Sequence, residues 1–399
     1  MTTDGRRILV AQALRAFVYG FGAVLLGVVL EQRRWSTTRA GLLLTSILAG
    51  TALLSVVVGR YGERIGRRRA YAVLFVGLAV TGIAFGVTSN IVVLVAAALI
   101  GSLSTDVVES GPFTSLEQAM LPETVPVAQR TRMFGTYNAV ATFAGSIGAL
   151  AAGGPQLLRD AGFGVGADHR FFLLFVPVGV LGAGVAMSLS PHVEARSKLA
   201  TSRPLTRSRS TVHRLAGLFA LDSFGGGFAV QSFLVFFLSK KFGLSTEQLG
   251  LVFFAVGFLQ TASFLAASRL AERFGLLETM VFTHLPSNLL LAGVALAPNA
   301  PVAIGLVLAR FALSQMDVPT RQAYVVALVD DDERVAASAY TATARYAVRP
   351  ISPLLGGVLQ QVSLGLPLLV AGACKTTYDV ALWHWFRRVP VPSTEEVNA

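Results

Sequence analysis

The chain has 399 residues, of which 53% are hydrophobic and only 14% are charged, and its mean hydropathy is +0.63. Soluble domains carry roughly 25% charged residues, so this composition excludes a soluble protein, whose surface tolerates apolar patches of only a few hundred Å². A single cysteine, Cys374, excludes a disulfide framework and a thiolate metal cluster, and five histidines without close spacing argue against a zinc site. We therefore expect a membrane protein without a metal or an organic cofactor.

Apolar stretches of about 20 residues, the length that crosses a bilayer, recur along the whole chain. The first is too long for the apolar core of a signal peptide, so we expect a membrane helix there. Gly111-Pro112 predicts a kink in the fourth stretch, and the glycines at 225–227 predict a bending point in the seventh. In chain order the predicted helices span residues 8–30, 40–59, 70–88, 91–120, 133–154, 171–190, 215–238, 246–267, 277–297, 301–321, 335–358 and 364–386.

The basic residues concentrate in alternate loops and in a central polar stretch. Because the cytoplasmic loops of membrane proteins are enriched in Lys and Arg, this pattern predicts a cell-membrane protein with both termini in the cytoplasm. It also explains the formal charge of +11 without nucleic acid, so we expect no such partner. The cytoplasmic set comprises Arg6, Arg7, Arg60, Arg64, Arg67, Arg68, Arg69, Arg269, Arg273, Arg387, Arg388 and the basic residues of the central stretch 196–214.

Two short sequence patterns recur in the second part of the chain. Glu63-Arg64-x-Gly66 recurs as Glu272-Arg273-x-Gly275. Glu117-Gln118-Ala119 is echoed by Arg321-Gln322-Ala323. Internal repetition of this kind predicts two six-helix halves. These halves are residues 1–190 and 214–399, the second ending in a short cytoplasmic tail, with a basic cytoplasmic linker at 191–213.

The loop after the second predicted helix follows the pattern Gly-x-x-x-Glu-Arg-x-Gly-Arg-Arg, with Gly59, Glu63, Arg64, Gly66, Arg67 and Arg68. This loop, its partner in the second half and the number of spans resemble the major facilitator superfamily, and within it the drug and metabolite efflux-like branch. The resemblance implies an all-α polytopic membrane protein with about 12 transmembrane helices in two pseudo-symmetric six-helix bundles. It also implies a cytoplasmic latch in which Glu63 and Arg64 cap and bridge helix ends. A purely topogenic role of the arginines is the alternative.

The chain departs from that family's pattern in two places. The arginine common midway along the fourth span is absent, and Asp106 lies at about that depth. The glycine-proline signature that antiporters carry in the fifth span is reduced to Gly145, Ala149, Leu150, Gly153 and Gly154.

Ionisable side chains inside the predicted helices are the main functional candidates. Each costs about 2.5–3.5 kcal/mol when it faces lipid near the helix centre, so we expect these groups to face protein or water. We single out Arg15, Asp106, Glu109, Asp222, Arg310, Asp317, Arg345, Arg349, Lys375 and Asp379.

The internal repeat pairs some of these charges with exchanged signs. Aligning the first span with the seventh puts Arg15 on Asp222, and aligning the fourth with the tenth puts Asp106 on Arg310. These four helices line the central cavity in the resembled family, so we expect Arg15 to meet Asp106 and Asp222 to meet Arg310. Our hypothesis is that Asp106 or Asp222 takes up a proton when its arginine is drawn away, with Glu109 as the reserve site. Two static salt bridges are the alternative.

Arg345 and Arg349 lie on one face of the eleventh predicted helix. With Asp317 as the nearest acid we can suggest, they either bind a carboxylate or phosphate of a substrate or are satisfied structurally.

Two further groups lie on helices that are peripheral in the resembled family. Lys375 and Asp379, four residues apart in the last helix, are expected to form a structural ion pair. His284, alone in the ninth helix, is assigned no role.

The combined expectation is a secondary transporter that moves a small organic solute by alternating access, coupled to protons and working as an exporter. Two alternatives stay open: proton-coupled uptake or exchange of an organic anion, and a membrane sensor or scaffold that does not transport. The sequence contains no Gly-x-Ser-x-Gly elbow, P-loop or paired-histidine metal helix, so we expect no enzyme. The expected partners are the solute, protons and the lipid bilayer, and we expect a monomer.

Overall fold

The computed structural model describes residues 2–100, 102–104, 111–126, 130–194, 205–330 and 333–389. Within these residues the chain forms helices and loops and no β-strand, which confirms the all-α class. The α-helices are α1 Thr3–Gln32, α2 Thr37–Ile65, α3 Arg67–Val87, α4 Ile91–Leu99, α5 Gly111–Met120, α6 Arg130–Ala151, α7 Gly154–Asp160, α8 Phe175–Ser188, α9 Arg209–Gly227, α10 Gln231–Phe242, α11 Thr246–Phe274, α12 Leu276–Leu296, α13 Ala300–Ser314, α14 Asp317–Ala327, α15 Arg334–Val348, α16 Ile351–Val362 and α17 Leu366–Phe386. The 3₁₀-helices are η1 Leu121–Thr124, η3 Asp168–Leu174 and η4 Pro191–Glu194.

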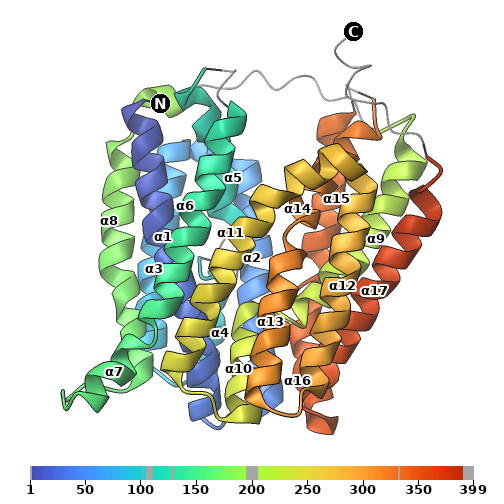
Figure 1. Ribbon diagram of the computed structural model, residues 1–399. Helices are drawn as coiled ribbons and strands as arrows, with labels where there is room; N and C mark the ends of the chain where they lie inside the picture. The colour runs from blue at the N-terminus through green and yellow to red at the C-terminus, as the bar shows by residue number, and fades with distance from the viewer. Residues whose placement is uncertain are drawn as a thin grey trace. The chain divides into compact units, whose positions relative to one another are not determined.

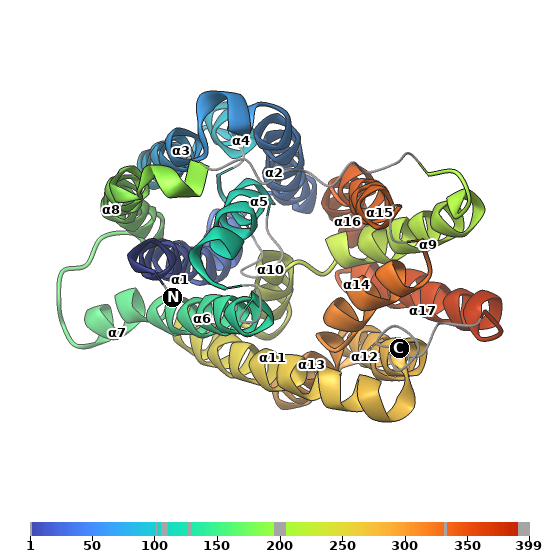
Figure 2. The same ribbon diagram turned by 90° about the horizontal axis from the view of Figure 1, so that it is seen from above.

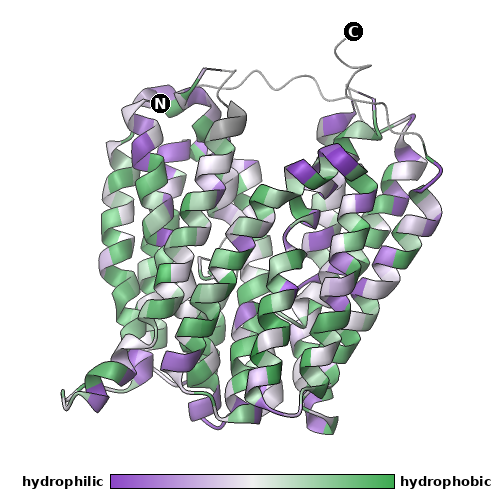
Figure 3. Ribbon diagram, in the orientation of Figure 1, coloured by the Kyte–Doolittle hydropathy of each residue, from purple (hydrophilic) through white to green (hydrophobic). Residues whose placement is uncertain are grey.

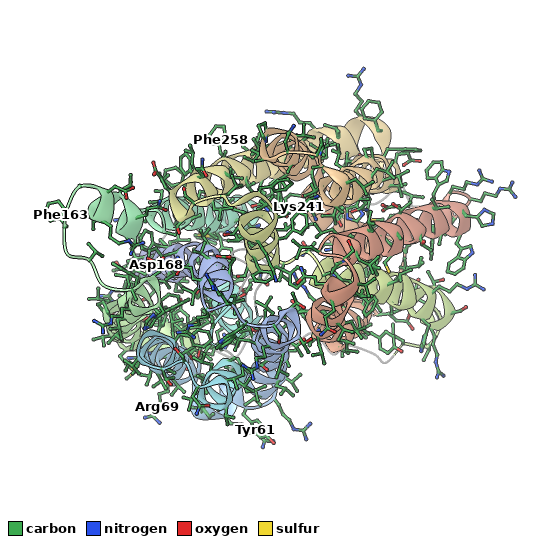
Figure 4. All side chains as sticks on the ribbon, turned by 90° about the horizontal axis from the view of Figure 1, so that it is seen from below. Tyr61, Arg69, Phe163, Asp168, Lys241 and Phe258 are labelled. Atoms are coloured by element: carbon green, nitrogen blue, oxygen red, sulfur yellow. The ribbon has the colours of Figure 1, made fainter. Side chains whose placement is uncertain are left out.

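Apolar residues are frequent along the described helices (Figure 3). Eight stretches of the described residues are long and apolar enough to cross a bilayer. Figure 4 shows Phe258 projecting from α11 and Phe163 in the loop after α7, and these side chains are 68% and 64% exposed. Exposed apolar surface of this kind marks where a chain meets lipid. The eight stretches are Thr3–Gln32, Thr37–Gly62, Arg67–Val87, Asp168–Ser188, Arg209–Phe242, Thr246–Phe274, Leu276–Leu296 and Ala300–Ala327.

Several predicted spans are interrupted helices. The bending point predicted at 225–227 is confirmed, because α9 ends at Gly227 and α10 begins at Gln231. At the predicted kink of the fourth span, α5 begins at Gly111, whose φ of 67° is unfavourable for residues with a side chain. The break between α15 and α16 lies next to Pro350, which we did not predict although proline restricts the preceding residue.

The chain folds into two compact units that interleave in sequence. In unit 1, α10, the first part of α11 and α16 pack with helices of the first half of the sequence. Ser232 Oγ, for example, donates to Ala23 O at 2.9 Å, and Thr37 Oγ1 donates to Gly357 O at 2.6 Å. Unit 1 comprises Met1–Arg196, Val230–Phe258 and Pro353–Gln361, and unit 2 comprises Ser197–Ala229, Leu259–Ser352 and Val362–Ala399.

Helix α1 forms the centre of unit 1, where it packs on α6 and α10 (Figure 1). The backbones of α1 and α6 come very close to each other. A Cβ added to Gly20 would lie 1.9 Å from Gly145 O, and one added to Gly148 would lie 1.9 Å from Phe17 O. Only glycine fits at these two positions, and the tight contact holds α1 in a fixed orientation.

In unit 2, α17 packs against both α9 and α12, and Figure 2 shows these three helices together. Apolar side chains of these helices, including Phe219, Met280 and Tyr378, belong to one buried cluster. The buried polar groups of α9, α12 and α17 therefore face one another inside unit 2.

Candidate functional site

Unit 1 contains a fully buried ion pair between α1 and α5. Arg15 Nη2 donates to Glu117 Oε2 at 2.8 Å, and Arg15 Nε donates to Glu117 Oε1 at 3.3 Å. Arg15 is 1% exposed and Glu117 is fully buried. Bidentate geometry of this kind is the strongest form of Arg–carboxylate contact. The guanidinium also lies 5.3 Å from the ring centroids of Tyr19 and Phe113.

Two tyrosines complete the shell of Glu117. Tyr71 Oη donates to Oε1 at 2.7 Å, and Tyr137 Oη donates to Oε2 at 2.5 Å. Each carboxylate oxygen thus accepts one bond from Arg15 and one from a phenol. The acceptor positions of both oxygens are therefore occupied by donors from three side chains.

Unit 2 contains a second buried carboxylate, Asp222 of α9, with several cations around it. Lys375 Nζ of α17 donates to Asp222 Oδ1 at 2.5 Å. Arg321 Nη1 lies 3.6 Å from Oδ2, and His284 Nε2 lies 3.7 Å from Oδ1. Asp222 is 3% exposed and Lys375 is 7% exposed. This cluster is the candidate functional site of unit 2.

The two ion pairs are related by the internal repeat with their signs exchanged. Arg15 aligns with Asp222, and Glu117 aligns with Arg321. The structure pairs Arg15 with Glu117 and brings Arg321 to 3.6 Å from Asp222. We predicted the exchange of signs but not the partners. The signal for these partners is the repeated sequence pattern, which contains Glu117 in its first copy and Arg321 in its second.

In the described part of the chain, Arg15 and Asp222 have other partners than the expected ones. Asp106 and Glu109 lie outside the described residues, and Arg15 is bonded to Glu117 instead. Arg310, the expected partner of Asp222, is 7% exposed and forms no hydrogen bond or salt bridge with it in the described part of the chain. Its Nε and Nη1 have no hydrogen-bond partner among the described residues, and its guanidinium lies 4.6 Å from the Phe311 ring.

Lys375 and Asp379 do not form the expected pair with each other. Lys375 binds Asp222, whereas Asp379 Oδ1 lies 2.8 Å from His284 Nδ1. Asn288 Nδ2 donates to the second oxygen of Asp379, also at 2.8 Å. Residues four apart share one face of α17, but the neighbouring helices offer each of them a better partner.

Asp317, by contrast, is bonded to a residue of its own helix. Arg321 Nη1 donates to Asp317 Oδ2 at 2.6 Å, an i,i+4 contact of α14.

Arg345 and Arg349 are half-buried at the end of α15. The carbonyl of Arg345 accepts a bond from Ser223 Oγ at 2.9 Å, which links α15 to α9. The binding of a substrate carboxylate or phosphate by Arg345, Arg349 and Asp317 stays a prediction.

The repeated loop has the same backbone conformation in both copies. Gly66 has a φ of 96° between α2 and α3, and Gly275 has a φ of 98° between α11 and α12. These values favour glycine strongly. In the second copy Glu272 and Arg273 are exposed, and the guanidinium lies 5.2 Å from the Phe274 ring.

In the first copy, the carboxylate that caps the start of α3 is Glu194. It accepts bonds from Arg67 N at 2.7 Å and from Arg68 N at 3.1 Å, where a helix N-terminus favours negative charge. Arg64 lies 5.9 Å from the Tyr61 ring. The side chain of Glu63 lies outside the described part of the chain, and Gly59 has no heavy atom within 4 Å of an added Cβ. The bridging role of Glu63 and Arg64 stays a prediction.

The chemistry that these groups offer is proton binding and ion pairing. Among the described residues, no group of three His, Cys, Asp or Glu side chains is arranged to hold a metal ion. The site of unit 2 instead joins two aspartates, a lysine, an arginine and a histidine, all buried: Asp222, Asp379, Lys375, Arg321 and His284. In such a cluster one added proton changes which groups attract each other.

Comparisons with known proteins agree with this fold. A family profile described as Major Facilitator Superfamily matches residues 8–394. The uncharacterized membrane protein YJR124C of Saccharomyces cerevisiae is 24% identical over 422 residues, which cover 96% of this chain and 94% of that protein. The crystal structure of the nucleoside transporter NupG has a TM-score of 0.73 at 12% identity, covering 97% of this chain and 100% of that chain. The D-xylose-proton symporter has a TM-score of 0.73 at 15% identity, covering 98% of both chains.

Proposed function

Because this chain belongs to the Major Facilitator Superfamily and is a multi-pass membrane transporter protein, we propose that it moves a small organic solute in exchange for protons. The moving bodies are the two sequence halves, 1–190 and 214–399, which open alternately to either side of the membrane. We place the chain in the cell membrane with both termini in the cytoplasm, where the basic loops lie.

The observation that supports proton coupling is the environment of Asp222. Its carboxylate is buried. Lys375 Nζ contacts one of its oxygens, Oδ1, at 2.5 Å, and Arg321 Nη1 lies farther away, at 3.6 Å from Oδ2. If Lys375 withdraws, the buried carboxylate loses its nearest cation, and a proton taken up within the cluster restores the lost positive charge. The ion pair and the bound proton thus exclude each other, which is what a coupling site requires.

Glu117 is the weaker candidate for the same role. Its oxygens are bonded to Arg15, Tyr71 and Tyr137, so a proton has no open position there. We infer that the pair in unit 1 fixes α1 and α5, while the pair in unit 2 changes during the cycle.

A flux measurement tests this assignment. A solute is first identified by thermal stabilisation of the purified protein, and its transport is then followed in proteoliposomes with and without a pH gradient. Asp222→Asn is expected to lose solute accumulation driven by the gradient and to keep solute exchange at equal concentrations. Asp330→Asn is the matched control, because Asp330 is half-exposed and pairs only loosely with Arg207. Normal gradient-driven accumulation by Asp222→Asn would contradict the proposal.

For direction we propose export. The support is the glycine-rich face of α6, a remnant of the antiporter signature, on which α1 packs through Gly145 and Gly148. In inside-out vesicles with an acidic lumen, an exporter accumulates the solute and alkalinises the lumen. Accumulation only under the opposite gradient would identify uptake.

Proton-coupled uptake or exchange of an organic anion is the second candidate, and Arg310 favours it. This guanidinium is buried, and two of its nitrogens, Nε and Nη1, lack an acceptor among the described residues. An unpaired buried cation is costly, and a substrate carboxylate or phosphate would satisfy it. In that case, Arg310→Gln weakens binding of an anionic solute at least tenfold and leaves a neutral analogue unaffected.

A further inference from the structure

His284 lies between the two buried aspartates of unit 2. On one side its Nδ1 is 2.8 Å from Asp379 Oδ1. On the other side its Nε2 is 3.4 Å from Lys375 Nζ and 3.7 Å from Asp222 Oδ1. The ring is 3% exposed, and Asn288 holds the far oxygen of Asp379 at 2.8 Å.

The contacts define what each protonation state of the imidazole does. In a neutral ring, one nitrogen donates and the other accepts. When Nδ1–H donates to Asp379, the Nε2 lone pair faces the ammonium of Lys375, and this contact is favourable. A second proton on Nε2 turns that nitrogen into a donor, which repels Lys375 Nζ and finds its nearest acceptor in Asp222 Oδ1.

We propose that His284 Nε2 accepts the coupling proton and that the protonated imidazole displaces Lys375 from Asp222. Lys375 and His284 both approach the same atom, Oδ1 of Asp222, at 2.5 Å and 3.7 Å. The proton comes from water on one side of the membrane and leaves to water on the other. This inference rests on the proposed proton coupling and identifies the group through which it acts.

The displacement of Lys375 is transmitted to the break between α9 and α10. A Cβ added to Gly225 would lie 2.8 Å from Lys375 Cγ, and one added to Gly226 would lie 3.8 Å from Lys375 Cε. The lysine stem therefore runs along the last turn of α9, which ends at Gly227. Movement of the ammonium frees this turn, where helix propensity is lowest.

Other charged groups near the imidazole affect how Lys375 and His284 compete for Asp222 Oδ1. From α14 come the carboxylate of Asp317 and the guanidinium of Arg321, which are bonded to each other. From α13, Arg310 adds positive charge to the same interior. From α17 the ring meets Asp379 and Lys375, whose charges are opposite.

Hydrogen exchange tests the proposal without any transported solute. The purified wild-type protein is labelled at pH 5.5 and at pH 8, with labelling times scaled for the intrinsic pH dependence of amide exchange. Peptides covering residues 221–230 are followed by mass spectrometry. We expect at least threefold faster scaled exchange at pH 5.5. His284→Gln keeps a polar side chain but holds no charge, so it is expected to show no difference between the two values.

Two further variants make the result decisive. Lys375→Met removes the displaced cation and is expected to show the fast exchange at both pH values. His213→Gln is the matched control, because His213 is exposed at the other end of α9, and it is expected to behave as the wild type does. A full pH response in His284→Gln, or a normal pH response in Lys375→Met, would overturn the inference. Absence of solute flux in wild-type vesicles would contradict the proposed function alone, since the exchange measurement does not depend on it.

Discussion

Four hydrogen bonds converge on Glu117, whereas the nearest cation of Asp222 contacts one oxygen only. This difference separates two buried carboxylates that the sequence repeat makes equivalent. A carboxylate with all its acceptor positions bonded fixes the helices that supply the donors. A carboxylate with one close cation, a more distant arginine and a neighbouring histidine is able to exchange that close partner.

At Glu117 we predict a large loss of stability without a specific loss of coupling. Glu117→Gln removes the charge opposite Arg15 and leaves a buried cation unpaired, which costs about 3–5 kcal/mol. Chemical or thermal unfolding in detergent measures the loss. Glu123→Gln, an exposed position near the end of the same segment, is the control and should change stability by less than about 0.5 kcal/mol. Equal stability of the two variants would show that the pair contributes nothing.

Glu333 provides a pH prediction outside the membrane spans. Backbone hydrogen bonds from Thr206 and Ser208, and the Thr206 hydroxyl, hold the pKa of Glu333 at about 2, below its usual 4.5. A lowered folded-state pKa adds stability above pH 4.5, and this is lost as the pH falls towards 2. The segment 205–208 before α9 should therefore loosen in this range.

The measurement is the thermal unfolding temperature of wild type and Glu333→Gln from pH 6 to pH 3. The two curves should be separated at pH 6 and converge towards pH 3, because the wild type alone loses an ionised carboxylate. The exposed Glu247, replaced by Gln, serves as the control. Curves that stay parallel over the whole range would exclude this role of Glu333.

Among the helices, the close contact between α1 and α6 depends on glycines, which have no side chain to keep the two backbones apart. Gly148 of α6 meets the carbonyl of Phe17, and Gly20 of α1 meets the carbonyl of Gly145. Close backbone approach through small residues is the usual way in which helices associate inside lipid. It fixes α1, and with it the position of Arg15.

Two alanine substitutions in α6 separate packing from helix propensity. Gly148→Ala would place Cβ 1.9 Å from Phe17 O, so we expect it to force α1 and α6 apart and to destabilise the protein by more than 2 kcal/mol. Gly135→Ala has no neighbour within 4 Å and should stabilise α6 by about 1 kcal/mol. Unfolding in detergent compares them, and equal effects would exclude the packing argument.

The long apolar helices of this chain were predictable because each depends on local composition, whereas the break between α15 and α16 was not predicted. The glycine bend after α9 and the repeated loop at Gly66 and Gly275 were predictable for the same reason. The partners of Arg15 and Asp222 were not, because partner choice depends on how helices rotate about their axes. Glu117 follows Asp106 by 11 residues in the sequence, about three turns of the continuous helix that we expected at 91–120.

Across the whole molecule, unit 1 joins helices from both sequence halves. α16 contacts α2 through Thr37 and Gly357, and Gln361 Nε2 donates to Thr38 Oγ1 at 2.6 Å. Leu354 N also donates to Thr45 Oγ1 at 3.0 Å. Under the proposed alternating access, these contacts form on one side of the membrane and must separate in each cycle.

A reversible cross-link tests this consequence. Thr38→Cys with Gln361→Cys, in a Cys374→Ser background, is treated with a short bifunctional thiol reagent. Complete cross-linking is expected to reduce solute flux at least tenfold, and a reductant should restore it. Thr38→Cys alone in the same background should be unaffected. Undiminished flux through the cross-linked protein would show that α2 and α16 stay together throughout the cycle.

The distance along the chain between Arg15 and Glu117 has a consequence for biogenesis. The two are 102 residues apart, so at about 5–20 residues per second the ribosome needs about 5–20 s to make the counter-ion after the arginine. During that time α1 carries an uncompensated cation whose insertion costs about 2.5–3.5 kcal/mol. α1 therefore has to stay sheltered beside the translocon until α5 emerges, and Asp222 faces a longer delay before Lys375, 153 residues later, is synthesised.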